Sequence, residues 1–231
     1  MRLSQRLFEK AARSQRPGQH MPGATNRDAR TQSPRPDQAG ELIRLEQEPA
    51  AIAGVFGVQA PVGLEACWVA DGRLLAGAHP AAGPYALDDR LSVLLDAGVR
   101  HFIDLTRDGE LPAYERLLGQ LAHARSTPVS YRRLPIPHRA GPETPRDMES
   151  ALGQLEDCLA DGGVTYMHGR DPMRRVGMVV GCFLVRRGQA SGVALDWLET
   201  RHWRNGGRLE TRPLTQAQKD FVTFWGKRKA A

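Results

Sequence analysis

From residue 66 onwards, apolar positions alternate between short runs and helical spacings. The runs predict two strands around an Asp71-Gly72 turn within residues 67–77, and further strands at 99–106, 129–136 and 164–168. Helical spacing, with Gly or Pro at several ends, predicts helices at 87–97, 112–124, 144–160, 175–187, 191–203 and 215–227. The stretch before residue 66 has no comparable period.

Alternating strands and helices at this spacing are typical of β-α-β units. The pattern therefore predicts an α/β fold, with a central, mostly parallel sheet of about four to five strands and helices on both faces. Ligands bind such sheets at the C-terminal ends of the strands, where residues 169–174 follow the last predicted strand. Trp197, Trp203 and Trp225 fall on the closing helices at spacings that indicate core packing.

Residues 1–62 are rich in Arg, Gln, Pro, Gly and Ala and hold few aromatic residues. Such a segment buries too little apolar surface to offset its ordering entropy, so we predict a disordered basic tail at 1–62 and one domain at 63–231. An amphipathic helix at 1–16 is the alternative for its start. Residues 1–40 carry eight basic and three acidic residues, most of the net charge of +6. The rest is nearly neutral and has no nucleic-acid recognition motif.

Cysteine spacing and hydropathy limit the classes of protein further. The three cysteines, at 67, 158 and 182, form no Cys-x-x-Cys pair and lie in apolar stretches, which fits core thiols in a reducing cytoplasm. The longest apolar run, at 176–185, is well short of the roughly 20 residues that span a bilayer. We therefore expect a cytoplasmic protein with no membrane span, no metal and no cofactor. The sequence does not indicate an oligomeric state.

The most informative stretch is 164–188, which begins VTYMHGRDPMRRVG. It resembles the signature of cysteine-dependent phosphatases, in which a strand ends in His-Cys and an Arg opens a buried helix after five further residues. Here His168, Arg175 and Gly177 stand at the matching positions. The nucleophile position holds Gly169, which has no side chain to form a phosphoenzyme.

Residues 66–80, 97–106 and 131–138 resemble other segments of a bacterial dual-specificity-type phosphatase family, so the likeness covers roughly 66–226. The resemblance implies that family's fold. It also implies its site, where an Arg and loop amides hold the phosphoryl oxygens and a neighbouring Asp protonates the leaving group.

The chain departs from this pattern at four places. Besides Gly169, His138 stands where the family has its general-acid Asp. Pro172 and Arg174 replace loop glycines, and proline has no N–H to offer an anion. Val176 stands where the family has a Ser or Thr hydroxyl. We therefore expect a degenerate catalytic site.

The remaining loop residues are still suited to an anion. The predicted binding set comprises Arg175, Arg170, Arg174, His168, Asp171 and Met173. For Arg175 the sequence leaves two roles open, anion binding or a structural ion pair near the helix start. His168 is expected to be a partly buried histidine whose hydrogen bonds are satisfied.

Three functional hypotheses follow. The first, which we favour, is a pseudophosphatase that binds a phosphorylated or anionic ligand or a protein partner without turnover. The second is an active phosphoester phosphatase that uses Asp171 or a water activated by His138. The third is a scaffold whose former pocket is closed, as Pro172 and Arg174 suggest.

Overall fold

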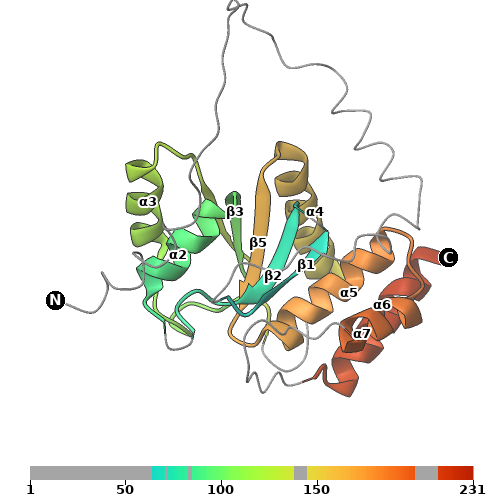
Figure 1. The fold of residues 1–231 in the computed structure, drawn as a ribbon. Helices are drawn as coiled ribbons and strands as arrows, with labels where there is room; N and C mark the ends of the chain where they lie inside the picture. Colours follow the sequence, from blue (N-terminus) through green and yellow to red (C-terminus); the bar gives the residue numbers. More distant parts are fainter. Residues whose placement is uncertain (1–63, 71, 83–84, 138–144, 201–212, 231) are drawn as a thin grey trace, which may run out of the picture. The chain divides into compact units, whose positions relative to one another are not determined.

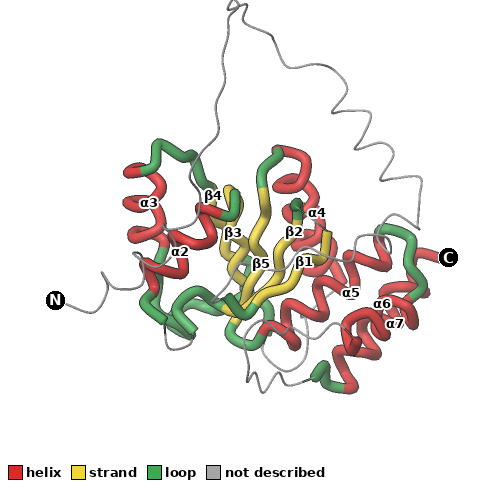
Figure 2. Tube along the Cα trace, viewed as in Figure 1, coloured by secondary structure: helices red, strands yellow, loops and turns green. Residues whose placement is uncertain are grey.

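The structure is a computed structural model that describes residues 64–70, 72–82, 85–137, 145–200 and 213–230. Its centre is a five-stranded sheet (Figures 1 and 2). The strands are β1 (Ala66–Ala70), β2 (Leu74–Ala78), β3 (Val99–Asp104), β4 (Ser130–Arg133) and β5 (Val164–Gly169). Their order is β1-β2-β5-β3-β4; β1 and β2 are antiparallel, and the other neighbours are parallel. The mostly parallel sheet predicted from the sequence is confirmed.

The last strand in the sequence, β5, lies in the middle of the sheet between β2 and β3. All six of its residues are buried, as expected of a parallel strand covered on both faces. Its register places Gly169 opposite Ala78 of β2 and His168 opposite Asp104 of β3. Three strand ends therefore meet at one edge of the sheet.

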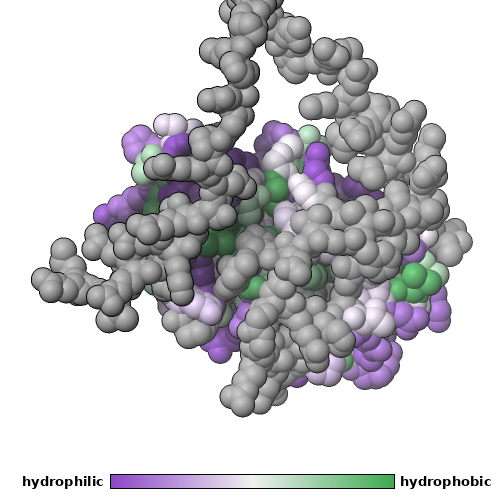
Figure 3. All heavy atoms as spheres, viewed as in Figure 1, coloured by the Kyte–Doolittle hydropathy of each residue, from purple (hydrophilic) through white to green (hydrophobic). Residues whose placement is uncertain are grey.

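Helices cover both faces of the sheet, as predicted (Figure 1). One apolar cluster joins the sheet to α2 (Leu87–Asp96) and α3 (Glu115–Ala124). The other joins it to α4 (Pro145–Asp161), α5 (Gly177–Arg186), α6 (Ser191–Thr200) and α7 (Gln216–Ala230). Around α3 the visible outer surface is mainly hydrophilic (Figure 3). Apolar residues thus face the sheet, and polar residues face solvent.

Helix α5, which follows β5 and the loop after it, is almost entirely buried. Every residue from Gly177 to Val185 is buried, and α6 and α7 pack along it. A Cβ at Gly181 would lie 3.0 Å from Cγ2 of Val222 and 3.1 Å from Cδ1 of Leu198. The absence of a side chain at Gly181 therefore sets how closely these helices approach.

Several predicted boundaries are wrong by a few residues, and α3 and β4 are two examples. Helix α3 begins at Glu115 rather than Pro112, and Tyr114 at its N-cap is buried against the sheet. Strand β4 ends at Arg133 rather than Ile136, and Pro135 follows it on the edge of the sheet, where a missing N–H costs no hydrogen bond to β3. The chain still follows β3, since the amides of Leu134 and Ile136 donate to the carbonyls of Asp104 and Leu105.

Several predictions concern residues outside the described ranges, namely the tail at 1–62, Trp203 and His138. Of the other closing-helix tryptophans, Trp225 is buried, and Trp197 packs against the core while partly exposed. Within the described ranges, none of the helices combines the length and apolar character that a bilayer crossing requires.

Candidate functional site

The candidate site lies where β2, β5 and β3 end together. The chain leaves β5 at Gly169, bends through Arg170 and Asp171, and forms one π-helical turn, Pro172–Val176, before α5 begins at Gly177. The sequence predicted a regular helix from Arg175, and that start is wrong. A single π turn at the head of an α-helix widens the backbone locally and is frequent at functional sites.

Gly169, which the sequence resemblance aligns with the nucleophile, has no steric need to be a glycine. It is buried, and a Cβ built there would lie 3.4 Å from Cγ2 of Val176 and 3.9 Å from Cβ of Leu105. These are ordinary van der Waals contacts. The backbone could therefore accept a Cβ at this position.

Backbone amides of the loop are only partly available to an anion. Pro172 has no N–H, and the N–H of Arg174 donates to the carbonyl of Asp171 over 3.3 Å. An open phosphate-binding loop would instead direct successive amides at the ligand. Anion binding here therefore depends more on side chains than it does in a glycine-rich loop.

Arg175 is the central side chain of the site, and it is completely buried. Its Nη1 donates to Oε2 of Glu110 over 2.8 Å and to the carbonyl of Leu105 over 3.0 Å, and Nη2 donates to Oε1 of Glu110. Nε is buried without a hydrogen-bond partner. The guanidinium is thus held along its Nη1/Nη2 edge, and its Nε side is unpaired. Arg175 therefore forms a structural ion pair with Glu110, and its unpaired Nε still leaves anion binding possible.

Glu110, the partner of Arg175, was not identified from the sequence. It lies in the loop between β3 and α3, and Oε2 also accepts the N–H of Arg107 over 3.1 Å. Hydrogen bonds from Arg175 are the main reason that the pKa of Glu110 lies below its usual value. The sequence did contain one signal for Glu110: it is an acidic residue in a predicted loop at the same edge of the sheet as the Arg-rich loop.

The other charged loop residues form pairs around this centre. Arg170 donates from Nη2 to the carbonyl of Glu110 over 2.8 Å, and its Nε lies 3.6 Å from Oε1 of that residue. Arg174 places Nε 3.6 Å from Oδ2 of Asp171, three residues earlier. Of the predicted set, the structure thus brings Arg170 and Arg175 together around Glu110. The side chain of Met173 and the whole of His138 lie outside the described residues.

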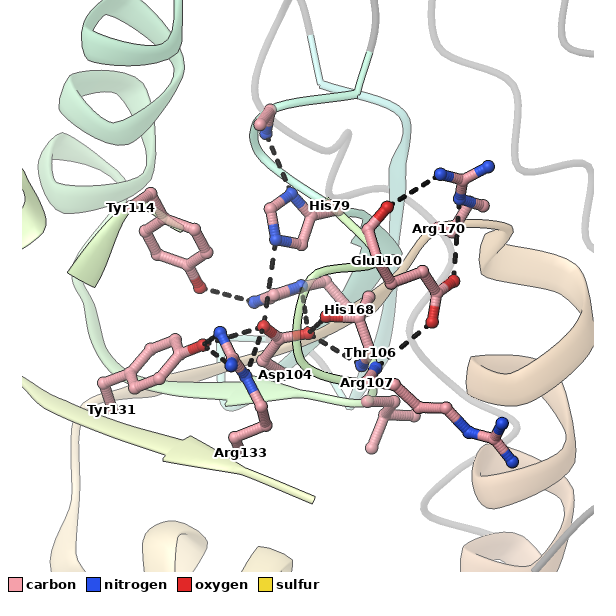
Figure 4. Close-up of polar contacts among 12 residues, drawn as sticks. His79, Asp104, Thr106, Arg107, Glu110, Tyr114, Tyr131, Arg133, His168 and Arg170 are labelled. Atoms are coloured by element: carbon pink, nitrogen blue, oxygen red, sulfur yellow. Dashed lines mark hydrogen bonds and ion pairs between the residues drawn. The ribbon is translucent and has the colours of Figure 1, made fainter. Parts of the chain in front are cut away.

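A buried polar network lies directly beneath the loop (Figure 4). At its centre is Asp104, which is fully buried at the end of β3. One carboxylate oxygen accepts the N–H and the hydroxyl of Thr106 over 2.8 and 2.7 Å, and the other accepts the hydroxyl of Tyr131 over 2.7 Å. Burial raises the pKa of Asp104, but nearby His168 and these hydrogen bonds outweigh it and keep that pKa below its usual value.

His168 is completely buried, not partly buried as the sequence suggested. Its Nε2 lies 2.6 Å from the hydroxyl of Tyr114, whereas Nδ1 has no hydrogen bond and lies 3.8 Å from Oδ1 of Asp104. Burial lowers the pKa of His168 to about 3, against the attraction of Asp104. The imidazole is therefore neutral near pH 7, and one of its two nitrogens is not satisfied.

His79, Asp104 and His168 bring three possible metal-ligand atoms within 4.8 Å of one another. The hydrogen bonds do not suit a metal ion. Nδ1 of His79 accepts the N–H of Ala81 over 3.1 Å, so a neutral ring carries its proton on Nε2, the atom that faces Asp104. Asp104 already accepts three hydrogen bonds. The cluster is better described as support for the loop.

The strand order, and the path from a central strand through a short loop to a buried arginine and helix, define the class of fold. It is the fold of protein tyrosine and dual-specificity phosphatases. No protein-family model matches the sequence.

Three solved structures illustrate the likeness. TpbA of P. aeruginosa is 16% identical, with a TM-score of 0.54, over 75% of this chain and 95% of that chain. Human DUSP28 is 18% identical, with a TM-score of 0.53, over 75% of this chain and 100% of that chain. PTPMT1 in complex with PI(5)P is 18% identical, with a TM-score of 0.52, over 70% and 96%. At these identities the likeness establishes the fold.

Proposed function

We propose that this protein is a pseudophosphatase, which binds a phosphorylated or anionic group, free or on a protein partner, without turning it over. The observation that carries the proposal is the state of Arg175. Its guanidinium is buried at the loop, anchored by Glu110 along one edge and unpaired at Nε. The same loop has Gly169 where the fold's nucleophile would stand.

An oxyanion would satisfy the unpaired side of this arginine. A buried donor without an acceptor costs about 1–3 kcal/mol, and more when it is charged. A phosphoryl group could accept from Nε and from the remaining N–H of Nη2, as a bidentate Arg–phosphate pair. Arg170, which is half exposed at the mouth of the loop, would add positive charge.

Turnover is not expected, because the nucleophile is missing. Loss of a catalytic nucleophile lowers kcat by about a million-fold in a serine protease, or roughly 8 kcal/mol of transition-state stabilisation. The alternative is an active phosphatase that uses Asp171 or a water activated by His138. It has less support, because Asp171 already forms an ion pair with Arg174.

The closed scaffold remains the second candidate, and it also rests on a specific observation. Pro172 lacks an N–H, and the N–H of Arg174 donates to Asp171 within the loop, so two amides are lost to an anion. If side chains cannot replace these donors, the loop has only a structural role. The binding experiment below separates the two candidates.

The fold neighbours suggest the type of ligand. One solved structure contains TpbA with pTyr, and another contains PTPMT1 with PI(5)P; both ligands carry a phosphate monoester. By analogy we propose a phosphate monoester on a protein or a small molecule as the ligand here. We further propose that the chain is a bacterial, cytoplasmic protein, with a disordered basic tail at 1–62 preceding the phosphatase-like domain at 63–231.

The test is phosphate-dependent thermal stabilisation of the wild-type protein at constant ionic strength. Saturating inorganic phosphate bound to the native state should raise the melting temperature. Arg175→Lys should remove most of the rise, because lysine keeps a charge for Glu110 but loses the planar guanidinium that can bind a phosphate through two N–H groups. Arg186→Met is the matched control, since Arg186 pairs with Glu149 and Glu156 at the far end of α5. The absence of any rise in the wild type would favour the closed scaffold.

A further inference from the structure

Arg90, in the first turns of α2, is a buried arginine outside the loop described above. Only 4% of its surface is exposed. Helical side chains point towards the helix N-terminus, and Nη1 of Arg90 accordingly donates to the carbonyl of Pro80 over 3.3 Å. The guanidinium also lies 5.6 Å from the ring centre of Tyr85, the residue before the N-cap. It therefore lies beside the N-terminal end of α2.

Most of the donors of Arg90 have no acceptor. Nε and Nη2 are both buried and form no hydrogen bond, which leaves three N–H groups unpaired. Arginine stays protonated in proteins, so these donors belong to a charged group removed from water. Buried charges are normally paired, and an unpaired one indicates a missing partner.

Neighbouring side chains do not supply that partner. Glu65 is the acidic residue whose pKa responds to Arg90, with burial raising that pKa and the arginine opposing the rise. Even so, the ion pairs within 4.0 Å among the described residues include none between Glu65 and Arg90. Asp88 and Asp89 of the first turn are exposed to solvent.

The helix end beside Arg90 also favours negative charge. Ala86 at the N-cap provides no side-chain hydrogen bond, so the first amides of α2 are not capped by that residue. Helix N-termini carry partial positive charge and bind anions through such amides. The ring of Tyr85 lies over the guanidinium and is 62% exposed, so this end of α2 borders solvent.

We propose that Arg90 and the N-terminal end of α2 form a second oxyanion site, which takes a phosphate or carboxylate group and is separate from the loop at Gly169–Val176. The site does not depend on the proposed function of that loop. The two sites are linked through the backbone: Arg90 donates to the carbonyl of Pro80, and the N–H of the preceding residue, His79, donates to the carbonyl of Gly169.

The test uses the side-chain Nε–H signal of Arg90 in ¹H–¹⁵N NMR spectra of the full-length Arg175→Lys protein. That background removes the loop arginine, so a failure of this site and a failure of the loop can be told apart. The signal is assigned by its loss in Arg90→Met. Inorganic phosphate and acetate are titrated separately at constant ionic strength. We expect a saturable shift with at least one of them, and the effective probe distinguishes phosphate from carboxylate.

Melting temperatures provide the second readout. In buffer free of both probes, Arg90→Met should melt higher than the wild type, because it removes an unpaired buried charge. In the Arg175→Lys background it should also abolish any remaining rise with the effective probe. Arg100→Met is the control: Nη1 of Arg100 donates to the carbonyls of Leu95 and Val99, so its loss should lower the melting temperature and leave the anion response intact.

Two results would overturn the proposal. One is an Nε signal of Arg90 that does not move with either anion. The other is an Arg90→Met protein that fails to fold or melts lower than the wild type in probe-free buffer. If Arg90→Met is destabilised in this way, Glu65→Gln should lower the melting temperature as well, and that result would identify Glu65 as the partner of Arg90 in solution.

Discussion

Gly169 stands where the phosphatase signature that this sequence resembles has its nucleophilic cysteine. The backbone there has room for a Cβ, with 3.4 Å to Val176 as the nearest contact. Gly169→Cys should therefore fold with a stability within about 1 kcal/mol of the wild type, since the added Cβ makes only ordinary contacts. Urea denaturation of the two proteins measures the difference. A loss of several kcal/mol would mean that the loop is packed more tightly than its geometry indicates.

Buried histidines beneath the loop should make stability depend on pH. Burial holds the pKa of His168 at about 3, so between pH 3 and its ordinary value near 6.5 the unfolded chain binds a proton that the native state does not. Stability should fall as pH falls through this range, by about 1.4 kcal/mol per pH unit for this group. Burial also lowers the pKa of His79, which adds to the loss in the same direction.

Urea denaturation between pH 7 and pH 5 tests this, because the lowered pKa of Asp104 places its contribution at more acidic pH. His168→Gln should reduce the slope of stability against pH. His123→Gln, on the exposed side of α3, is the matched control and should keep the wild-type slope. Equal slopes in wild type and His168→Gln would show that His168 is not held neutral by burial.

At the scale of elements, the β3–α3 loop and the loop after β5 are joined through Glu110 and Arg175. Glu110→Gln should lower stability by about 1–3 kcal/mol, because it weakens charge-assisted hydrogen bonds to a buried guanidinium. Asp108→Asn is the control. That aspartate is 90% exposed and pairs with Arg133, so its loss should change stability by less than about 1 kcal/mol. Equal effects of the two variants in urea denaturation would contradict the importance of the Glu110–Arg175 pair.

Helix packing gives a second prediction at this scale. Gly181→Val should lower stability by about 1–3 kcal/mol, since Val222 and Leu198 already lie at the limit of contact with a Cβ at this position. Gly153→Ala, in α4, should instead raise stability by about 0.5–1 kcal/mol, because its Cβ would meet nothing within 4 Å and alanine favours the helix. Melting temperatures test both predictions: that of Gly181→Val should be lower than the wild type's, and that of Gly153→Ala should be higher. A stabilised Gly181→Val would show that α5 does not pack as described.

The sequence predicted elements best where apolar periodicity was continuous. The predicted strand at 164–168, the buried helix after it and the two hairpin strands within 67–77 follow from local patterns, and the structure contains all of them. The π turn at Pro172–Val176 was missed, because it depends on how the loop meets the sheet edge. Glu110 was missed for a related reason: sequence spacing does not indicate which loop acid will reach a buried arginine.

For the molecule as a whole, the fold is that of protein tyrosine and dual-specificity phosphatases, and the loop at one strand end departs from their sequence signature. The sheet, both helical layers and the buried Arg175 are those of a phosphatase-like domain, and the polar network at Asp104 supports the loop from below. The loop begins with Gly169 rather than a cysteine, and its amides are partly used within the loop. We propose that such a molecule holds a phosphorylated group rather than cleaving it.

The most direct test of this account is the turnover of para-nitrophenyl phosphate by the purified wild-type protein, measured beside Gly169→Cys and Arg175→Lys. We predict no wild-type turnover above that of Arg175→Lys. Turnover by Gly169→Cys would show that the missing thiol is the main deficit. Wild-type turnover that disappears in Arg175→Lys would contradict the account, because it would require a nucleophile other than the one that Gly169 replaces.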